Sequence, residues 1–185
     1  MFSKSASLVA ALAVLSASAA LAPGTASAQD LAGYLTQHGY VPIKMTKLST
    51  GHETVMVTIN GVQGQFVVDS GAGGTVVHNG RLEKFSLQAP QGEGEASSGA
   101  GGGFTAFRAD VQSFVIEGVP LDIDQVRTLD LGAVVDQLKL ATGADIDGVV
   151  GQDVLTRFAG VLDVGAQTLF LRPTEQAAER DPIIQ

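Results

Sequence analysis

One aspartate stands in a setting that suits acid–base chemistry. Asp69 ends the apolar run of residues 66–68 (FVV) and is followed at once by Ser70 and Gly71. Aromatic and β-branched residues predict a buried strand. The strand would place this carboxylate beside the apolar interior, where the dielectric constant is low. Two carboxylates that lie a hydrogen bond apart share one proton and can act as base and acid. We therefore interpret Asp69 as half of a catalytic pair.

The same residues could form an ordinary turn. Asp and Ser bond nearby backbone N–H groups and Gly permits positive φ, so Asp-Ser-Gly is common in turns. The flanking sequence favours chemistry instead, because an apolar strand leads into Asp69 and residues 75–77 (TVV) lead out. Gly71 would also let the backbone approach the site closely.

Rival chemistries fit the sequence less well. Residues 71–74 (GAGG) are not followed by the Gly-Lys-Ser/Thr of a phosphate loop. Gly99–Gly103 precede a strand, which argues against a dinucleotide fingerprint. A triad built on Ser70 and His78 lacks a nucleophile elbow. The three histidines show no ligand spacing, and residues 145–148 (DIDG) fall short of a calcium loop, so we expect no metal and no cofactor.

Three predicted strands position Asp69. Residues 41–48 are expected as the first strand and Thr54–Ile59 as the second. Asn60-Gly61 is a strong turn signal, and we expect Gln63-Gly64 to extend that loop. Residues 65–69 then form the third strand, which ends at the aspartate.

A Gly-rich stretch follows at residues 91–103 (QGEGEASSGAGGG). It precedes residues 104–116, which read as one strand. The stretch is either the tip of a long hairpin or a disordered loop, and the sequence does not separate the two.

The remaining segments alternate between strand and helix patterns. We expect one more strand over residues 119–126. Residues 161–164 and 167–173 are expected to form a hairpin that turns at Gly165-Ala166. Helices are predicted at 31–38 after an Asp30 cap, at 131–140 and at 152–158. Four aspartates alternate with apolar residues and are expected on outward strand faces: Asp122, Asp124, Asp145 and Asp147.

These features together resemble a known family. Residues 66–72 (FVVDSGA), with 75–77 after them, resemble the active-site loop of retropepsin-like (clan AA) aspartic proteases of the bacterial exported type. Residues 146–151 (IDGVVG) resemble the second signature of that family, and the Gly-rich stretch falls where it carries its flap. The resemblance spans roughly residues 41–173, with extra predicted helices and an unusually Gly-rich flap as departures.

The resemblance implies a mainly β fold: a closed β-barrel or sandwich with one or two short helices and a flap hairpin. It implies an aspartic endopeptidase acting on a peptide or protein substrate. Asp69, Ser70 and Gly71 are then catalytic, with Ser70 bracing the active loops. The implied substrate-binding residues are Ala72, Ser98, Gly99, Ala100 and Gly101. The alternative is a non-catalytic relative that serves as an envelope binding or scaffold module.

A homodimer follows from counting carboxylates. The chain offers one Asp-Ser-Gly, and its internal echo at Val149-Val150-Gly151 has no acid at the turn. A single chain therefore supplies half of a dyad, and a two-fold axis through the active loops would supply the rest.

Composition sets the remaining expectations for this chain of 185 residues. Lys4, an apolar run over residues 8–22 and the A-x-A site at 26–28 predict a signal peptide cut after Ala28. We therefore expect a periplasmic or secreted protein with no stable membrane insertion after cleavage. Cysteine is absent, which excludes disulfides.

The expected organisation is a signal peptide at 1–28, a short helical segment at 29–40, one protease domain at 41–173 and a polar tail at 174–185. Removal of residues 1–28 takes away one charge, that of Lys4, and leaves 10 basic against 19 acidic residues, a net charge of −9. No basic cluster occurs, so nucleic acid is not an expected partner.

Overall fold

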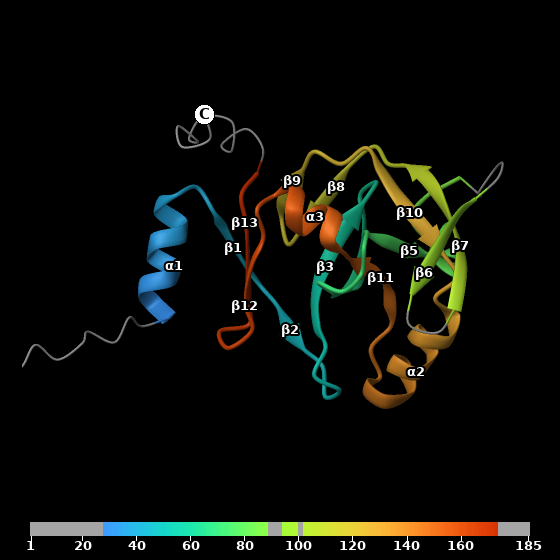
Figure 1. Ribbon diagram of the computed structural model, residues 1–185, viewed down its shortest axis with the longest axis horizontal. Helices are drawn as coiled ribbons and strands as arrows, with labels where there is room; N and C mark the ends of the chain where they lie inside the picture. Colours follow the sequence, from blue (N-terminus) through green and yellow to red (C-terminus); the bar gives the residue numbers. More distant parts are fainter. Residues whose placement is uncertain (1–27, 89–93, 100–101, 174–185) are drawn as a thin grey trace, which may run out of the picture.

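A computed structural model describes residues 28–88, 94–99 and 102–173. The chain is mainly β with a few short helices (Figure 1). In order, the elements are α1 (Ala28–Gln37), β1 (Val41–Lys44), β2 (Thr46–Lys47), β3 (Glu53–Ile59), β4 (Val62–Val68), β5 (Val76–His78), the 3₁₀ turn η1 (Asn79–Arg81), β6 (Glu95–Gly99), β7 (Gly102–Asp110), β8 (Phe114–Ile116), β9 (Val119–Leu121), β10 (Gln125–Leu129), α2 (Gly132–Thr142), β11 (Ile146–Val150), α3 (Gln152–Arg157), β12 (Val161–Asp163) and β13 (Thr168–Leu171).

Within the described residues the strands form two sheets. The small sheet has the order β1-β13-β12. The ten-stranded sheet has the order β6-β7-β10-β5-β11-β4-β3-β8-β9, with β2 added beside β3. Figure 1 shows α1 and the small sheet at one end of the molecule and the β6–β7 hairpin at the other.

The position of β11 decides where the loop between β4 and β5 lies; this loop, residues 69–75, is called the active loop below. β11 pairs with β4 in parallel, so that Val150 lies opposite Val68, and with β5 in the antiparallel sense, so that Val149 lies opposite Val76. The loop between β4 and β5 therefore closes over the end of β11. Gly148 permits this crossing, because a Cβ there would overlap the carbonyl of Val76 and the ring of Phe66.

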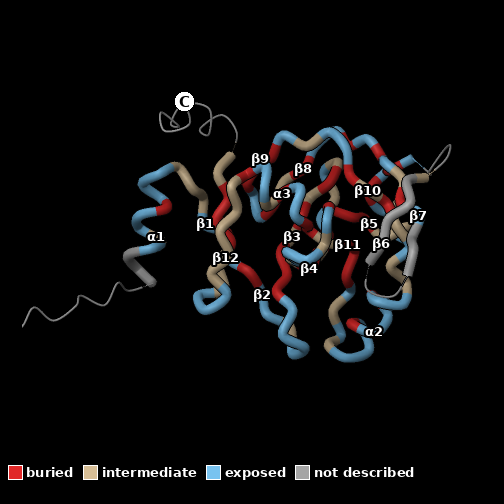
Figure 2. Tube along the Cα trace, viewed as in Figure 1, coloured by how far each residue is buried: buried red, intermediate tan, exposed pale blue. Residues whose placement is uncertain are grey.

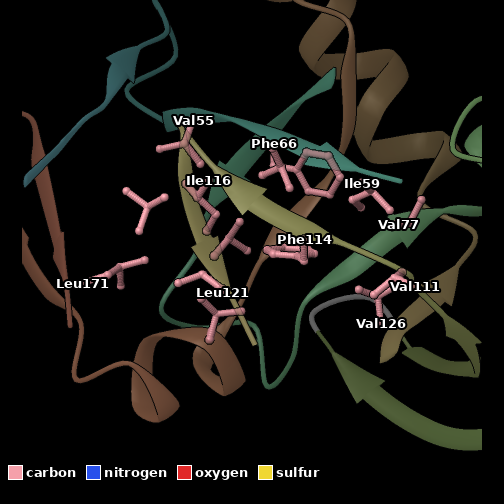
Figure 3. Packing of buried hydrophobic residues seen from close by; sticks show 14 of the residues in the cluster. Val55, Ile59, Phe66, Val77, Val111, Phe114, Ile116, Leu121, Val126 and Leu171 are labelled. Carbon is pink, nitrogen blue, oxygen red and sulfur yellow. The ribbon is translucent and has the colours of Figure 1, made fainter. Parts of the chain in front are cut away.

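A buried core lies beneath this crossing. Figure 2 shows the buried residues concentrated on the central strands. The main cluster joins both sheets, as Figure 3 shows for Val55, Ile59, Phe66, Val77, Val111, Phe114, Ile116, Leu121, Val126 and Leu171. A second cluster of Val67, Val135, Leu138 and Ile146 packs α2 against the other face of β4 and β11. Both faces of the strand before Asp69 are thereby covered, which limits its movement.

Most predicted elements are present, but several boundaries were wrong. The turn is the two residues Asn60 and Gly61, with φ of 51° and 81°, which fits a type I′ hairpin turn. The third strand therefore starts at Val62, and Gln63-Gly64 lie in it rather than in a loop. The predicted strand at 41–48 divides into β1 and β2, which belong to different sheets.

Further along the chain, the predicted strand over 104–116 divides into β7 and β8. The expected strand at 119–126 likewise divides into β9 and β10. The helix expected at 31–38 begins earlier, at Ala28. The helices predicted at 131–140 and 152–158 and the hairpin turning at Gly165-Ala166 are confirmed as α2, α3 and β12–β13.

The expectation for Asp147 was also wrong, because this residue faces inward. It lies at a bulge of β11 and is 2% exposed. Its Oδ2 accepts hydrogen bonds from the Gln65 backbone N–H at 2.9 Å and from Lys84 Nζ at 2.8 Å. Arg81 Nε lies 3.2 Å from Oδ1. The buried charge is thus compensated by two cations and one amide.

Candidate active site

Asp69 directly follows β4 and is held at both its backbone and its side chain. Its N–H donates to the carbonyl of Val150 at 3.0 Å, and its Oδ1 accepts from the Gly71 N–H at 2.8 Å. A Cβ on Gly71 would lie 3.1 Å from Oδ1, so glycine leaves this carboxylate uncrowded. Asp69 and Ser70 are exposed in the single chain.

The start of α3 fixes the middle of the active loop. The Gln152 N–H donates to the Ala72 carbonyl at 2.8 Å, and Gln152 Nε2 donates to the Ser70 carbonyl, also at 2.8 Å. The two backbones touch closely here, because a Cβ on Gly151 would overlap the carbonyl of Gly74. Glycine at position 151 is therefore required by packing between the two signature segments.

A hydroxyl–carboxylate contact closes the far end of the loop. Thr75 is buried, and its N–H and Oγ1 both donate to Asp153, at 2.8 and 2.7 Å from Oδ1. Thr75 Oγ1 in turn accepts from the Gly151 N–H at 3.1 Å. One side chain thus ties the loop to both β11 and α3.

Arg127 reaches the same loop from β10. Its Nη1 donates to the Gly73 carbonyl at 3.2 Å and lies 4.0 Å from Asp153 Oδ2. Its backbone N–H donates to the Thr75 carbonyl at 3.1 Å. Active-loop residues 69–75 are therefore contacted from β10, β11 and α3.

An open hollow adjoins the active loop. It has a volume of about 520 Å³ and is lined by Ser70, Gln152, Leu155, Thr156, Ala159, Gly160 and Leu162. Its walls come from the loop, from α3 and from β12, and they mix apolar and polar groups. Ser70 is the only lining residue that belongs to the active loop.

The structure places the predicted site residues in two groups. Asp69, Ser70, Gly71 and Ala72 lie together on the active loop. Ser98 and Gly99 lie on β6, whose backbone pairs with β7 so that Ser98 is opposite Gly103. Within the described residues, the parts of the Gly-rich stretch at 95–99 and 102–103 form paired antiparallel strands. Ala100 and Gly101 lie outside the described residues.

The described part of the chain contains neither a metal-binding cluster nor a membrane-spanning helix. No group of three His, Asp or Glu residues there could hold a metal ion. Nor does any helix there have the length and apolar character needed to span a membrane.

Sequence reasoning missed the side chains that hold the loop: Thr75, Arg127, Gln152 and Asp153. Asp153 lies in the first turn of α3, and its Oδ1 also accepts from the Val154 N–H at 2.8 Å. The pair of glycines at 73–74 was the available signal, since a loop without side chains needs support from elsewhere.

Comparison with known proteins agrees with this geometry. A family model described as aspartyl protease matches residues 55–154, which is more than half of the chain. The chain belongs to the aspartyl protease family. The matched range begins in β3 and ends in α3, so it contains the active loop and every residue found to hold it. No curated protein matches the sequence.

Solved structures share the fold at low sequence identity. A retropepsin-like aspartic protease from Rickettsia conorii is 19% identical, with a TM-score of 0.50 over 72% of this chain and 92% of its own. An EIAV protease complexed with the inhibitor HBY-793 is 18% identical, with a TM-score of 0.48 over 64% of this chain and 98% of its own. The fold expectation, mainly β and retropepsin-like, is confirmed.

Proposed function

We propose that the protein is an exported aspartic endopeptidase whose catalytic pair forms from Asp69 of two chains. The observation that carries the proposal is the placement of Asp69. Its backbone is fixed by β11, its carboxylate is open to solvent, and the chain belongs to a protease family. A braced, exposed carboxylate is suited to meet a partner group and a substrate.

The chemistry follows from one shared proton. The ionised Asp69 takes a proton from water, and the water oxygen attacks the carbonyl carbon of the peptide bond. The protonated Asp69 gives its proton to the carbonyl oxygen, which yields a tetrahedral intermediate. The C–N bond then breaks as the aspartate that took the proton from water gives it to the leaving nitrogen, while the other aspartate takes a proton back from a hydroxyl of the intermediate. Two carboxylates that lie a hydrogen bond apart cannot both stay ionised, so the Asp69 pair holds one proton at the pH where the enzyme works.

The hollow beside Ser70 is where we place the second copy. It is continuous with the active loop, and β12 on its rim is an edge strand with β13 as its partner in the described sheet. A two-fold axis beside Ser70 would set the two Asp69 carboxylates face to face and cover both hollows. The signal-peptide pattern of residues 1–28 supports a periplasmic or secreted location.

Asp69→Asn tests the proposal. The amide fits the same space but cannot act as the base, so cleavage of a denatured protein between about pH 4 and 6 should vanish. Circular dichroism should be unchanged. Mixing wild type with excess Asp69→Asn should lower activity more steeply than dilution does, because mixed dimers hold one competent carboxylate.

Two results would contradict the proposal. Wild-type activity in Asp69→Asn would remove the residue from the mechanism. Specific activity that stays constant on dilution and resists the mutant would remove the dimer. A wild type that binds peptides without cleaving them would instead favour the scaffold module.

A further inference from the structure

We propose that Arg127 is a positioning residue that fixes the Gly73-Gly74 segment of the active loop and thereby sets how tightly substrate binds. The inference rests on the proposed protease function and adds a residue outside both signature segments.

Gly74 packs against Gly151, but the other anchoring hydrogen bonds of the active loop lie on either side of this segment. Val150 and Gln152 hold the first half, through the Asp69 N–H and the carbonyls of Ser70 and Ala72. Asp153 holds the far end through Thr75. Gly73 and Gly74 lie between these anchors and have no side chains of their own. Glycine loses more conformational freedom on ordering than other residues, so this segment needs an external partner.

Arg127 is that partner. Its guanidinium donates to the Gly73 carbonyl and fills the space that a side chain at position 74 would occupy: the three atoms nearest to a Cβ built on Gly74 all belong to Arg127. β10 is paired on both sides, with Arg127 opposite Val76 of β5 and Arg108 of β7. The side chain therefore starts from a fixed backbone and is about one-third exposed.

Ordering this segment in advance affects substrate binding more than the chemical step. The Asp69 end of the loop keeps its own anchors without Arg127. Ala72, one of the residues expected to bind substrate, directly precedes this segment. A substrate that binds a mobile segment must order it, and that cost appears in KM.

Gly74 offers a second way to remove the contact. Its φ is not in the left-handed region, so alanine fits the backbone, and the nearest obstacle is the guanidinium. Gly74→Ala should displace Arg127 while keeping its charge. Gly33→Ala, on α1 and away from the active loop, is the control for a glycine-to-alanine change, because a Cβ there meets nothing within 4 Å. Arg157→Met controls for loss of a cation, since Arg157 pairs with Asp122 on the surface.

The experiment compares Arg127→Met, Arg127→Lys, Gly74→Ala and the double variant Gly74→Ala/Arg127→Ala. For Arg127→Met and Gly74→Ala we expect KM to rise roughly fivefold, the loss of about one hydrogen bond, with kcat within about twofold and an unchanged pH profile. Arg127→Lys should restore part of the loss. The double variant should be no worse than either single one, because both remove the same contact.

Amide exchange at Gly73 and Gly74 gives a readout independent of turnover. Measured in the Asp69→Asn background, it should be faster in Arg127→Met and Gly74→Ala, and unchanged in Gly33→Ala and Arg157→Met. Wild-type KM and exchange in Arg127→Met, or effects of the two single variants that multiply in the double, would overturn the role of Arg127. A wild type that cleaves nothing would overturn the proposed function, while the exchange data would still decide whether Arg127 fixes the loop.

Discussion

Two buried threonines beside the active loop differ in what their hydroxyl groups contact. Thr75 is 1% exposed, and its Oγ1 bonds both Asp153 and the Gly151 N–H. Thr128 on β10 is fully buried, and its Oγ1 has no hydrogen-bond partner among the described residues. A buried polar atom stabilises a fold only where it is paired.

The two positions therefore predict opposite outcomes for the same substitution. Thr75→Val should lower the free energy of unfolding by about 1–3 kcal/mol, because it leaves the Gly151 N–H buried without a partner. Thr128→Val should be neutral or stabilising, and it serves as the matched control. Urea denaturation of the Asp69→Asn form measures both without self-cleavage. Equal effects at the two positions would mean that the Thr75 hydroxyl does not hold the loop.

Asp69 could be found from the sequence because its signal is local: an apolar strand, an acid, then small residues. The residues that hold it could not. Arg127 and Asp153 are far from Asp69 in the chain, and their contacts with the loop depend on β10 pairing with β5 and on β11 pairing with β4 and β5. No local pattern specifies that pairing.

At the level of elements, ion pairs hold η1, the residues that follow it and α2 against the start of β11. Lys84 and Arg81 contact Asp147, with nitrogen–oxygen distances of 2.8 and 3.2 Å. Arg81 and Lys139 contact Asp145, at 2.8 and 3.0 Å. The hydrogen bond from Lys139 is the main cause that lowers the pKa of Asp145 below its ordinary value. This carboxylate therefore stabilises the fold above its unfolded pKa, and the contribution is lost as pH falls through the folded value.

Asp147 should matter far more than Asp145. Asp147→Ala would leave two cations and the Gln65 N–H without their buried partner, so we expect a loss of about 3 kcal/mol in the free energy of unfolding. Asp145 is half exposed, and Asp145→Ala should cost less than about 1 kcal/mol. Chemical denaturation at neutral pH separates the two. A similar small loss at both positions would show that the bulge is held by packing alone.

The inward position of Asp147 also shows where alternation misleads. Apolar and acidic residues alternate at 144–147, which is typical of an exposed strand face. A bulge between Ile146 and Gly148 breaks the regular alternation, and the cations that make the burial tolerable lie in another segment.

On the scale of the whole molecule, the exposed hollow beside Ser70 predicts where self-association can be blocked. Thr156 lies on its wall and is exposed, so Thr156→Arg should leave the fold intact while placing a charge against the proposed second copy. We expect the dimer dissociation constant to rise by at least about tenfold. Gln137→Arg, on the exposed side of α2, adds the same charge elsewhere. Sedimentation velocity on both should show weaker association for Thr156→Arg alone; equal behaviour would move the interface away from this hollow.

The insertion of β11 between β4 and β5 also constrains the order of folding. β4 and β5 are consecutive in the chain, yet in the described sheet the strand that joins them comes from far downstream, as the 82-residue separation of Gln65 and Asp147 illustrates. Closing so long a loop costs entropy before strand contacts offset it, which slows folding. Until residues 146–150 arrive, β4 and β5 each keep an unpaired edge, and Asp69 lacks the carbonyl that holds it. A chain emerging N-terminus first therefore completes its active loop only when nearly the whole domain is available, which builds a delay between synthesis and a formed site.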